Sequence, residues 1–403
     1  MVELCKSKDC TGCSACVQSC PKNCISFITS DEGFYYPRID GSNCISCKKC
    51  VHSCPVLNKP CYDSRYDNPI VCAIYTNNKK LLLNSASGGV FSQVATALIE
   101  RKYSIYGAAF DNQLNVSIVK ANTKKELERI TGSKYIQANN SHVYLDIKSD
   151  LLRGHKVFYC GTPCQVAGLY SFLGGDSKNL ITADIVCHGV PSDKLWKAYL
   201  NYLQTQKSIK PIDYKFRDKT KWGWGSWGSY SYLKGNMMKK HYFPVASDYY
   251  YSLFFKENCL RESCYSCRFK GINSVSDFTI GDYWGIERAH PHFYNKNGVS
   301  VVLVHTEKAK NILKGLRNQF SIQLSTAEKA ICGNKSIISS TIRPKSRDLF
   351  YKELNKYGFE ITAKKYVHLR RIVPYISRYV PKRVKWKISR IIPKLSRKMV
   401  DSI

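Results

Sequence analysis

Residues 10–21, CTGCSACVQSCP, place four cysteines at steps of three, three and four, and a proline follows the last. Residues 44–55, CISCKKCVHSCP, repeat this spacing with different residues between the cysteines. Each iron of a [4Fe-4S] cubane needs one thiolate, and three closely spaced cysteines let a short loop bind three corners of one cluster. The two runs therefore predict two [4Fe-4S] clusters close to the N-terminus.

The fourth ligand of each cluster is expected from the other run. In the two-cluster ferredoxin arrangement, the cysteine that precedes proline ligates the cluster of the opposite triplet. One predicted set is Cys10, Cys13, Cys16 and Cys54, and the other is Cys44, Cys47, Cys50 and Cys20. Zinc is the alternative, but it favours two separated CxxC pairs and gives no reason for two triplets that each end in Cys-Pro.

The other N-terminal cysteines do not follow this spacing. Cys5, Cys24, Cys61 and Cys72 are expected to be ordinary buried thiols. Residues 25–40, ISFITSDEGFYYPRID, are typical of a short hairpin between the two runs. The sequence thus predicts a ferredoxin domain over residues 1–60 and a linker over residues 61–69.

Composition places the chain among globular proteins of a reducing compartment. It has 403 residues, 44% of them hydrophobic, and 19 cysteines, and no signal-peptide pattern opens the sequence. We expect a cytoplasmic protein whose thiols are available to metals. No run approaches the roughly 18 apolar residues of a membrane-spanning helix.

From residue 70, short apolar runs alternate with helical patterns. Strands are expected at residues 70–76, 104–110, 156–160 and 180–187, and helices at 88–102, 164–173 and 192–204, where Ser192 can cap the last helix. This alternation predicts a mixed α/β domain with partly parallel pairing over residues 70–330. Residues 212–244 are rich in aromatic and β-forming residues and predict a hairpin layer added to this domain.

Two glycine motifs have different contexts. GWGSWG, residues 223–228, matches the dinucleotide pattern but lacks the strand before it and the helix after it, so it is interpreted as an aromatic-rich active-site loop or a plain turn. SASGGVF, residues 85–91, precedes an amphipathic helix, where main-chain N–H groups can face an anion. A tight turn is the alternative interpretation of SASGGVF.

Five segments together resemble the coenzyme F420 hydrogenase/dehydrogenase beta-subunit family, whose members are flavin and iron-sulfur enzymes. These segments are SASGGVFSQVATAL, TGSKYIQ, GTPCQVAGL, DIVCHGVPS and CYSCRFKGINSVSDFTIGDYWG, and the resemblance covers about residues 70–310. The resemblance implies a third [4Fe-4S] cluster and an FAD. Fusion to the ferredoxin domain and a basic C-terminal extension over residues 331–403 distinguish this chain from the hydrogenase members.

The resemblance assigns ligands to both groups. The third cluster would be held by Cys164, Cys187, Cys264 and Cys267, with Cys160 and Cys259 as extra cysteines and zinc as the alternative. FAD would be cradled by Ser87, Gly88, Gly89 and Val90 together with Thr131, Gly132, Ser133, Lys134 and Tyr135. A lysine at a helix end is the alternative role of Lys134.

Two residues are catalytic candidates. Asp282 in IGDYWG would lie near the flavin or substrate face, and a turn residue at a strand end is the alternative. His188 follows a predicted cluster cysteine and can titrate near neutrality, so it is a candidate proton donor. A histidine hydrogen-bonded behind the ligands is its alternative role.

The predicted function is that of an iron-sulfur flavoprotein oxidoreductase. Clusters carry single electrons, FAD stores two, and a small-molecule or cofactor substrate exchanges them. A ferredoxin or another redox partner would supply or receive the electrons at the N-terminal clusters. The alternative is a non-catalytic electron-transfer subunit that serves a partner enzyme, and a zinc-stabilised binding protein is the third interpretation.

The C-terminal segment is strongly basic. Residues 361–400 contain thirteen Lys or Arg and no Asp or Glu, mixed with apolar residues and broken by three prolines. This pattern suits peripheral contact with the anionic inner face of a membrane, and a solvated or packed terminal segment is the alternative. No nucleic-acid partner is expected, because no nucleic-acid-binding module accompanies the charge.

Overall fold

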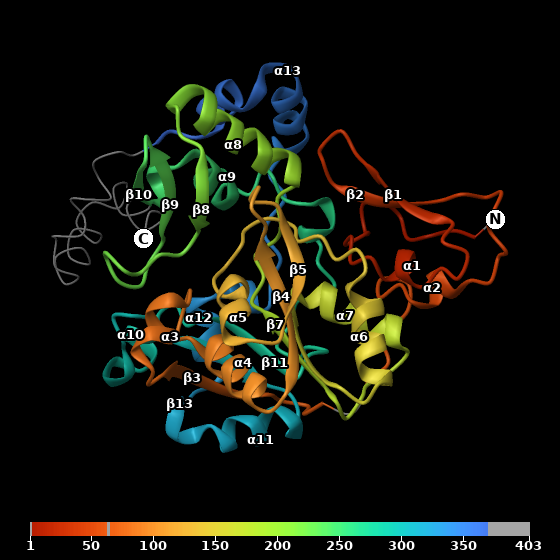
Figure 1. Ribbon diagram of the computed structural model, residues 1–403, viewed down its shortest axis with the longest axis horizontal. Coiled ribbons are helices and arrows are strands. Elements are labelled where there is room, and N and C mark those ends of the chain that lie inside the picture. Colours follow the sequence, from red (N-terminus) through yellow and green to blue (C-terminus); the bar gives the residue numbers. More distant parts are fainter. Residues whose placement is uncertain (1, 63–64, 370–403) are drawn as a thin grey trace.

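The computed structural model describes residues 2–62 and 65–369 of the chain (Figure 1). Its N-terminal module holds the short helices α1 (Ala15–Gln18) and α2 (Lys49–His52) and the antiparallel strands β1 (Ile25–Thr29) and β2 (Tyr35–Ile39). Ser14 and Lys48, the residues before the two helices, both have left-handed φ angles, of 74° and 58°. The backbone therefore turns in the same way in the two cysteine runs. Strands β1 and β2 form the hairpin that is expected between the runs.

An eight-stranded mixed sheet forms the centre of the body, in the order β13-β3-β12-β11-β7-β6-β4-β5. Strands β4, β6, β7 and β11 are parallel neighbours, whereas the remaining pairs are antiparallel. The predicted mixed α/β character is confirmed. The strands are β3 (Ile70–Thr76), β4 (Tyr103–Phe110), β5 (Val116–Ala121), β6 (Lys156–Gly161), β7 (Leu180–Ile185), β11 (Phe278–Asp282), β12 (Ser300–Val304) and β13 (Phe320–Leu324).

Amphipathic helices cover this sheet. In α4 (Val90–Glu100), Val90, Val94 and Leu98 recur at helical spacing and are buried in the core that the helix shares with the sheet. Helix α7 (Pro163–Leu173) begins with a Thr162 capping box and ends at Gly174, which has a φ of 78°. The other helices of the sheet are α3 (Lys79–Asn84), α5 (Lys124–Ile130), α6 (Val143–Leu152), α10 (Ile286–Ala289), α11 (Glu307–Gly315) and α12 (Ala327–Gly333).

The aromatic-rich segment forms a second, separate sheet. Its antiparallel strands are β8 (Pro211–Lys215), β9 (Trp227–Lys234) and β10 (Met237–Pro244), in the order β10-β9-β8. They share a buried aromatic core with α8 (Asp193–Lys207), α9 (Tyr249–Phe255) and α13 (Arg347–Tyr366). Ser192 accepts a hydrogen bond from the Leu195 amide, as expected of the cap of α8.

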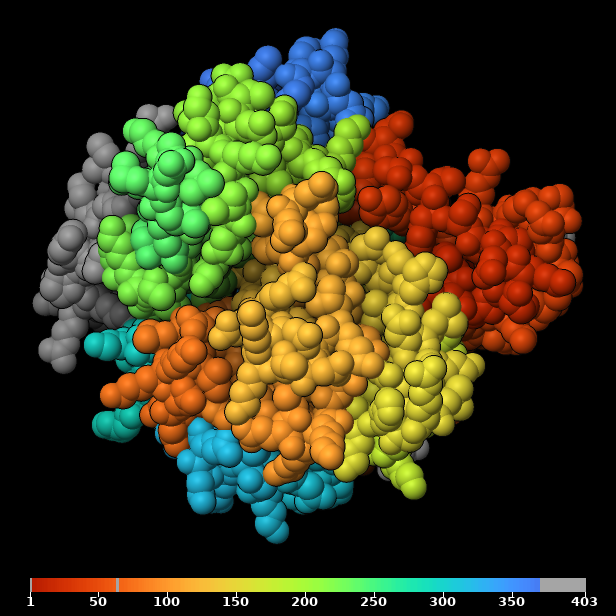
Figure 2. Space-filling view, in the orientation of Figure 1, coloured from red at the N-terminus to blue at the C-terminus, as the bar shows by residue number. Residues whose placement is uncertain are grey.

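The N-terminal module lies against one side of the body (Figures 1 and 2). Buried Arg347 pairs with the Glu32 carboxylate through two nitrogens, one of them at 2.7 Å. The Lys194 ammonium donates to the Asp31 carbonyl at 2.8 Å. These contacts fix the hairpin of the module onto α13 and α8 of the body.

The basic segment from residue 370 onward lies outside the described residues, so its proposed membrane contact falls there as well. The described part of residues 331–403 contains the end of α12 and all of α13. Within residues 2–62 and 65–369, none of the helices has the length and apolar character needed to cross a membrane.

Candidate iron-sulfur and cofactor sites

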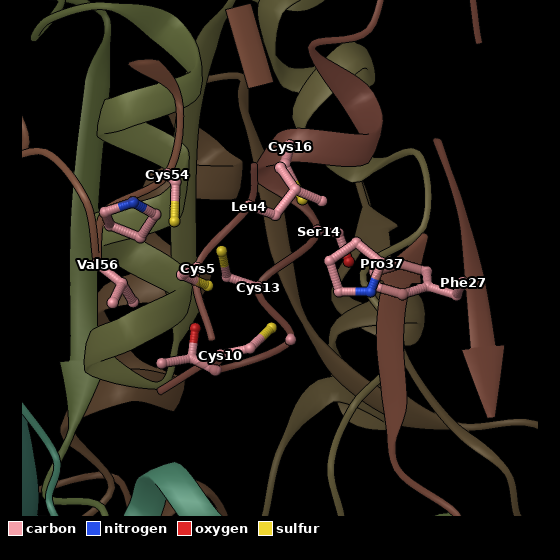
Figure 3. A pocket seen from close by; sticks show the side chains of 13 residues that line it. Leu4, Cys5, Cys10, Cys13, Ser14, Cys16, Phe27, Pro37, Cys54 and Val56 are labelled. Atoms are coloured by element: carbon pink, nitrogen blue, oxygen red, sulfur yellow. The ribbon is translucent and has the colours of Figure 1, made fainter. Parts of the chain in front are cut away.

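One hollow of the N-terminal module is lined by five cysteines (Figure 3). Four of them are the predicted set from both runs, and the fifth is Cys5: the lining cysteines are Cys5, Cys10, Cys13, Cys16 and Cys54. Apolar side chains, among them Leu4, Phe27 and Val56, complete the lining. The structure thus brings the Cys-Pro cysteine of the second run to the triplet of the first.

A second hollow, formed at the other end of the module, has the same construction. Its cysteines are Cys20, Cys24, Cys44, Cys47 and Cys50, of which Cys47 is exposed. The expectation that Cys5 and Cys61 are ordinary buried thiols is wrong, because Cys5 is partly exposed and lines the first hollow and Cys61 is exposed. Cys24 is buried as expected, and it also lines the second hollow. Cys72 is a buried thiol of β3, as expected.

The thiols of the first hollow interact with one another. The Cys5 thiol donates to Cys10 and Cys54, which lowers the pKa of Cys10 to about 6 and the pKa of Cys54 to about 7. Sulfur-only donor sets of this kind suit iron-sulfur clusters, whose thiolates each bind a different iron. Within residues 2–62 and 65–369, no group of three or more His, Cys, Asp or Glu side chains is placed to hold a single metal ion.

A third cysteine group lies in the body, where parallel strands end. Cys164 follows β6, Cys187 follows β7, and Cys264 and Cys267 come from the loop before β11. The four thiols interact electrostatically, and burial raises the pKa of Cys187 to about 11 and that of Cys264 to about 12. All four predicted residues therefore lie in one partly buried region.

Helix α7 and Arg261 join the first hollow to this third group. A β-carbon at Gly168 would lie 2.9 Å from both Cβ and Sγ of Cys13, so α7 packs directly on the first hollow one turn after Cys164. Arg261 is fully buried and donates to the Cys10 carbonyl at 2.7 Å, three residues before Cys264. The first hollow is consequently the inner one, and the second hollow is the outer one.

The SASGG segment is shaped by close packing. A β-carbon at Gly88 would lie 2.2 Å from the Ile74 carbonyl, and the Gly88 amide donates to the Ser300 hydroxyl. The Gly88 amide is therefore not free to bind an anion, and the expected role of the other amides of the motif stays a prediction. Gly89 has a φ of 79° and precedes Val90, which begins α4.

The TGSKY segment follows α5. Thr131 is the C-cap of the helix, Gly132 has a φ of 82°, and the Lys134 ammonium donates to several carbonyls of residues 129–132, among them Thr131 at 2.9 Å. Burial lowers the pKa of Lys134 to about 7. Lys134 thus caps the carboxyl end of a helix, which is the alternative role that the sequence allows.

Asp282, at the end of β11, is the centre of a polar cluster. Its carboxylate accepts hydrogen bonds from Arg217 at 2.8 and 3.3 Å and from the Trp224 indole at 2.7 Å. The Trp224 ring stacks on Trp284 at 4.7 Å with an interplanar angle of 2°. The GWGSWG loop therefore contributes an aromatic side chain and a donor to this cluster.

The predicted flavin segments meet around Arg217 and Lys219. The Lys219 ammonium donates to the Ser87 carbonyl at 2.6 Å, while Arg217 interacts with both Asp282 and Tyr135. Burial and the nearby Arg217 charge lower the pKa of Lys219 to about 7. Arg217 Nε is buried without a hydrogen-bond partner among the described residues, so a polar group could accept from it there.

His188 packs on the same aromatic ring as Tyr135, because Phe254 contacts both side chains. Its Nε2 is 3.2 Å from the Glu257 carboxylate, and its ring packs on Phe254 and Phe255. This position, directly after Cys187 in the sequence, suits a histidine held behind that predicted ligand.

Sequence reasoning missed five residues of these sites: Arg217, Lys219, Arg261 and the two additional hollow-lining thiols Cys5 and Cys24. Arg217 and Lys219 belong to the charged run FRDKTKW directly before the aromatic loop, and that concentration of charge was the available signal. Arg261 acts on a main-chain carbonyl 251 residues away in the sequence, a contact that no local pattern encodes.

The comparisons with known proteins agree with this organisation. Residues 9–58 match the family model described as a 4Fe-4S dicluster domain, and the chain is accordingly an iron-sulfur protein. Residues 154–330 match the model that describes the C terminus of the Coenzyme F420 hydrogenase/dehydrogenase beta subunit. The segment belongs to that family of oxidoreductase subunits, and the resemblance indicated by the sequence is confirmed.

Among solved structures, the chain is similar to one in the F420-reducing [NiFe] hydrogenase complex from Methanosarcina barkeri. The identity is 14%, the match covers 74% of this chain and 91% of that chain, and the TM-score is 0.43. No curated protein matches the sequence.

Proposed function

We propose that this chain is an iron-sulfur flavoprotein oxidoreductase that passes electrons between ferredoxin-type clusters and FAD. The predicted cluster ligands are the eight cysteines of the two runs and the four of the body group. Three four-iron clusters would give about twelve irons per chain. We also propose four parts of the chain: a ferredoxin domain, a linker, an α/β domain and a basic extension, over residues 1–60, 61–69, 70–330 and 331–403. The boundary at residue 330 falls within α12.

The observation that carries the proposal is the convergence of the two predicted flavin segments and the catalytic candidate Asp282. Ser87, Tyr135 and Asp282 all contact the Arg217–Lys219 segment, although they come from three distant parts of the sequence. Strand β11, which ends at Asp282, also runs beside the segment that leads to Cys187, because the Val186 amide donates to the Ile280 carbonyl at 2.9 Å. Bound FAD would supply two-electron storage at this place.

Chain residues would orient the cofactor there. Arg217 has a free donor at Nε, and its pKa is raised, because the Asp282 carboxylate outweighs the effect of burial. The cation would suit an electron-rich, polar edge of a flavin, and Trp224 and Trp284 offer aromatic faces beside it. Asp282 is accordingly a positioning residue for Arg217 in this proposal, and His188 is a candidate proton donor.

The outer hollow would exchange electrons with a ferredoxin or another redox partner. Its cysteine Cys47 is exposed, and the charged residues that line it are two lysines, Lys22 and Lys48. A cationic surface of this kind attracts acidic partners. Electrons would then pass from the outer to the inner cluster and on to the body group.

A second candidate is a non-catalytic electron-transfer subunit, which the description of the matched family as a beta subunit favours. With reduced viologen and a small-molecule substrate, an oxidoreductase turns over repeatedly. A transfer subunit instead reduces its flavin once and stops without its partner enzyme.

Anaerobic purification with iron, sulfide and flavin quantified together tests the proposal. We expect about twelve irons and one FAD per chain. Arg217→Met should lose most of the FAD and keep the irons, whereas Glu100→Gln, at an exposed ion pair with Lys124, should keep both. A protein with twelve irons and no flavin would rule out the flavin-dependent oxidoreductase and favour the non-catalytic electron-transfer subunit.

A further inference from the structure

Each cysteine hollow of the N-terminal module contains one thiol more than a four-iron cluster needs. A [4Fe-4S] cluster takes four thiolates, and each hollow offers five. The surplus thiols are Cys5 in the inner hollow and Cys24 in the outer one, because both lie outside the repeated spacing.

The two surplus thiols occupy equivalent places. Cys5 interacts with Cys10, the first thiol of its triplet, and with Cys54, the thiol from the opposite run. Cys24 interacts in the same way with Cys44 and with Cys20, whose Sγ lies 3.4 Å from Cys24 Sγ. Each surplus thiol therefore lies where the triplet meets the ligand from the other run.

The two neighbours of Cys5 are held differently. The Cys10 carbonyl accepts hydrogen bonds from Arg261 at 2.7 Å and from Ser263 at 3.0 Å, both from buried side chains of the body. Among the described residues, the Cys54 carbonyl accepts from two amides of its own loop, at Leu57 and Asn58. Figure 3 shows Cys5 among Cys10, Cys13 and Cys54. Arg268 of the body reaches this loop only at the Val56 carbonyl, at 3.3 Å, so Cys54 is held to the body less directly than Cys10.

We propose that Cys5 is an alternative ligand of the inner cluster and can take the iron that Cys54 holds. This inference rests on the proposed cluster. In the exchange, the iron–sulfur bond to Cys5 forms, the bond to Cys54 breaks, and the proton of the Cys5 thiol passes to the Cys54 sulfur. No iron changes its oxidation state, so the step needs neither an oxidant nor a reductant.

Alanine variants of the full chain test this inference through iron content and electron paramagnetic resonance. Cys54→Ala should retain about twelve irons, because Cys5 replaces the missing ligand. The double variant Cys5→Ala with Cys54→Ala should lose one to four irons and show a three-iron signal. Cys16→Ala, which removes a thiol that is not a hydrogen-bond partner of Cys5, should lose iron although Cys5 is present.

Equal iron loss in Cys54→Ala and in the double variant would overturn the inference. A wild-type protein without the inner cluster would instead refute the proposed function, so the two failures are distinct.

Cys5→Ala alone keeps all four predicted ligands and therefore folds as the wild type does. It should release inner-cluster iron to a chelator several-fold faster than wild type and than the control Cys72→Ala, a buried thiol of β3. Equal release rates would also overturn the inference.

Discussion

The Arg261 guanidinium and the Cys10 carbonyl form a 2.7 Å hydrogen bond that joins the body to the inner cysteine hollow. The same side chain donates to the Tyr35 carbonyl at 3.0 Å and lies 4.4 Å from the centre of the Tyr36 ring. The fully buried guanidinium therefore lies beside the first thiol of the inner hollow. It holds the N-terminal module against the body and places a positive charge next to this hollow.

Replacing Arg261 by Met should lower the reduction potential of the inner cluster, because a nearby positive charge favours the reduced form. It should also reduce the free energy of unfolding by about 3 kcal/mol, since buried carbonyl acceptors lose their partner. Redox titration followed by electron paramagnetic resonance measures the first effect and thermal unfolding the second. Arg38→Met, an exposed cation of β2, is the control. An unchanged potential in Arg261→Met would contradict the prediction.

Gly168→Ala should disturb the inner hollow selectively. The added methyl group would lie 2.9 Å from Cys13 and from the Tyr144 hydroxyl, so Cys13 must shift, at a cost of about 1–3 kcal/mol. The spectrum of the inner cluster should change, while that of the outer cluster should not. Gly175→Ala, where no atom lies within 4 Å of the new carbon, should leave both unchanged. Identical spectra in the two variants would refute this packing argument.

His305 should make the fold sensitive to acid. It is fully buried beside Thr279, and burial, with the charge of Arg65, lowers its pKa from 6.5 to about 3. Between these values the unfolded chain binds more protons than the folded chain, so stability falls as the pH falls. The free energy of unfolding should be about 2 kcal/mol lower at pH 5 than at pH 8.

His305→Asn removes this titration, and comparison with wild type cancels contributions from the clusters. Denaturant unfolding at several pH values should show a flatter pH dependence for the variant between pH 6.5 and pH 4. Parallel pH profiles would show that His305 is not the titrating group.

Lys48→Glu should slow electron transfer with an acidic ferredoxin. The substitution reverses one of the two charges that line the outer hollow, and steering between unlike charges is strongest at low salt. We expect a roughly tenfold slower second-order rate at low ionic strength and a smaller difference at high salt. Lys80→Glu, at an exposed lysine of the body, is the control. Equal slowing by both variants would indicate a general charge effect.

The parts of this structure that were predictable from the sequence are those with a local or periodic signature. The cysteine spacing indicated which thiols share a hollow, and the alternation of apolar runs predicted the mixed sheet and the cap at Ser192. Such features depend on residues close in sequence or on a repeat.

The parts that escaped prediction depend on distant partners. Lys219 and Arg261 donate to main-chain carbonyls 132 and 251 residues away, and any residue can supply a carbonyl. Gly88 is required by the approach of β3 and β12, which only the folded sheet creates. The amide expected to face an anion instead bonds Ser300 for the same reason.

Helix α7 sets the geometry of any relay through this protein. Cys164 lies in its first turn, and Gly168, about one turn or roughly 5.4 Å of rise later, packs against Cys13. Together with Arg261 and Arg347, this helix holds the N-terminal module against the body. In the proposed relay, electrons would therefore cross from the module to the body by tunnelling over a fixed gap, and a longer linker at residues 61–69 should leave the transfer rate unchanged.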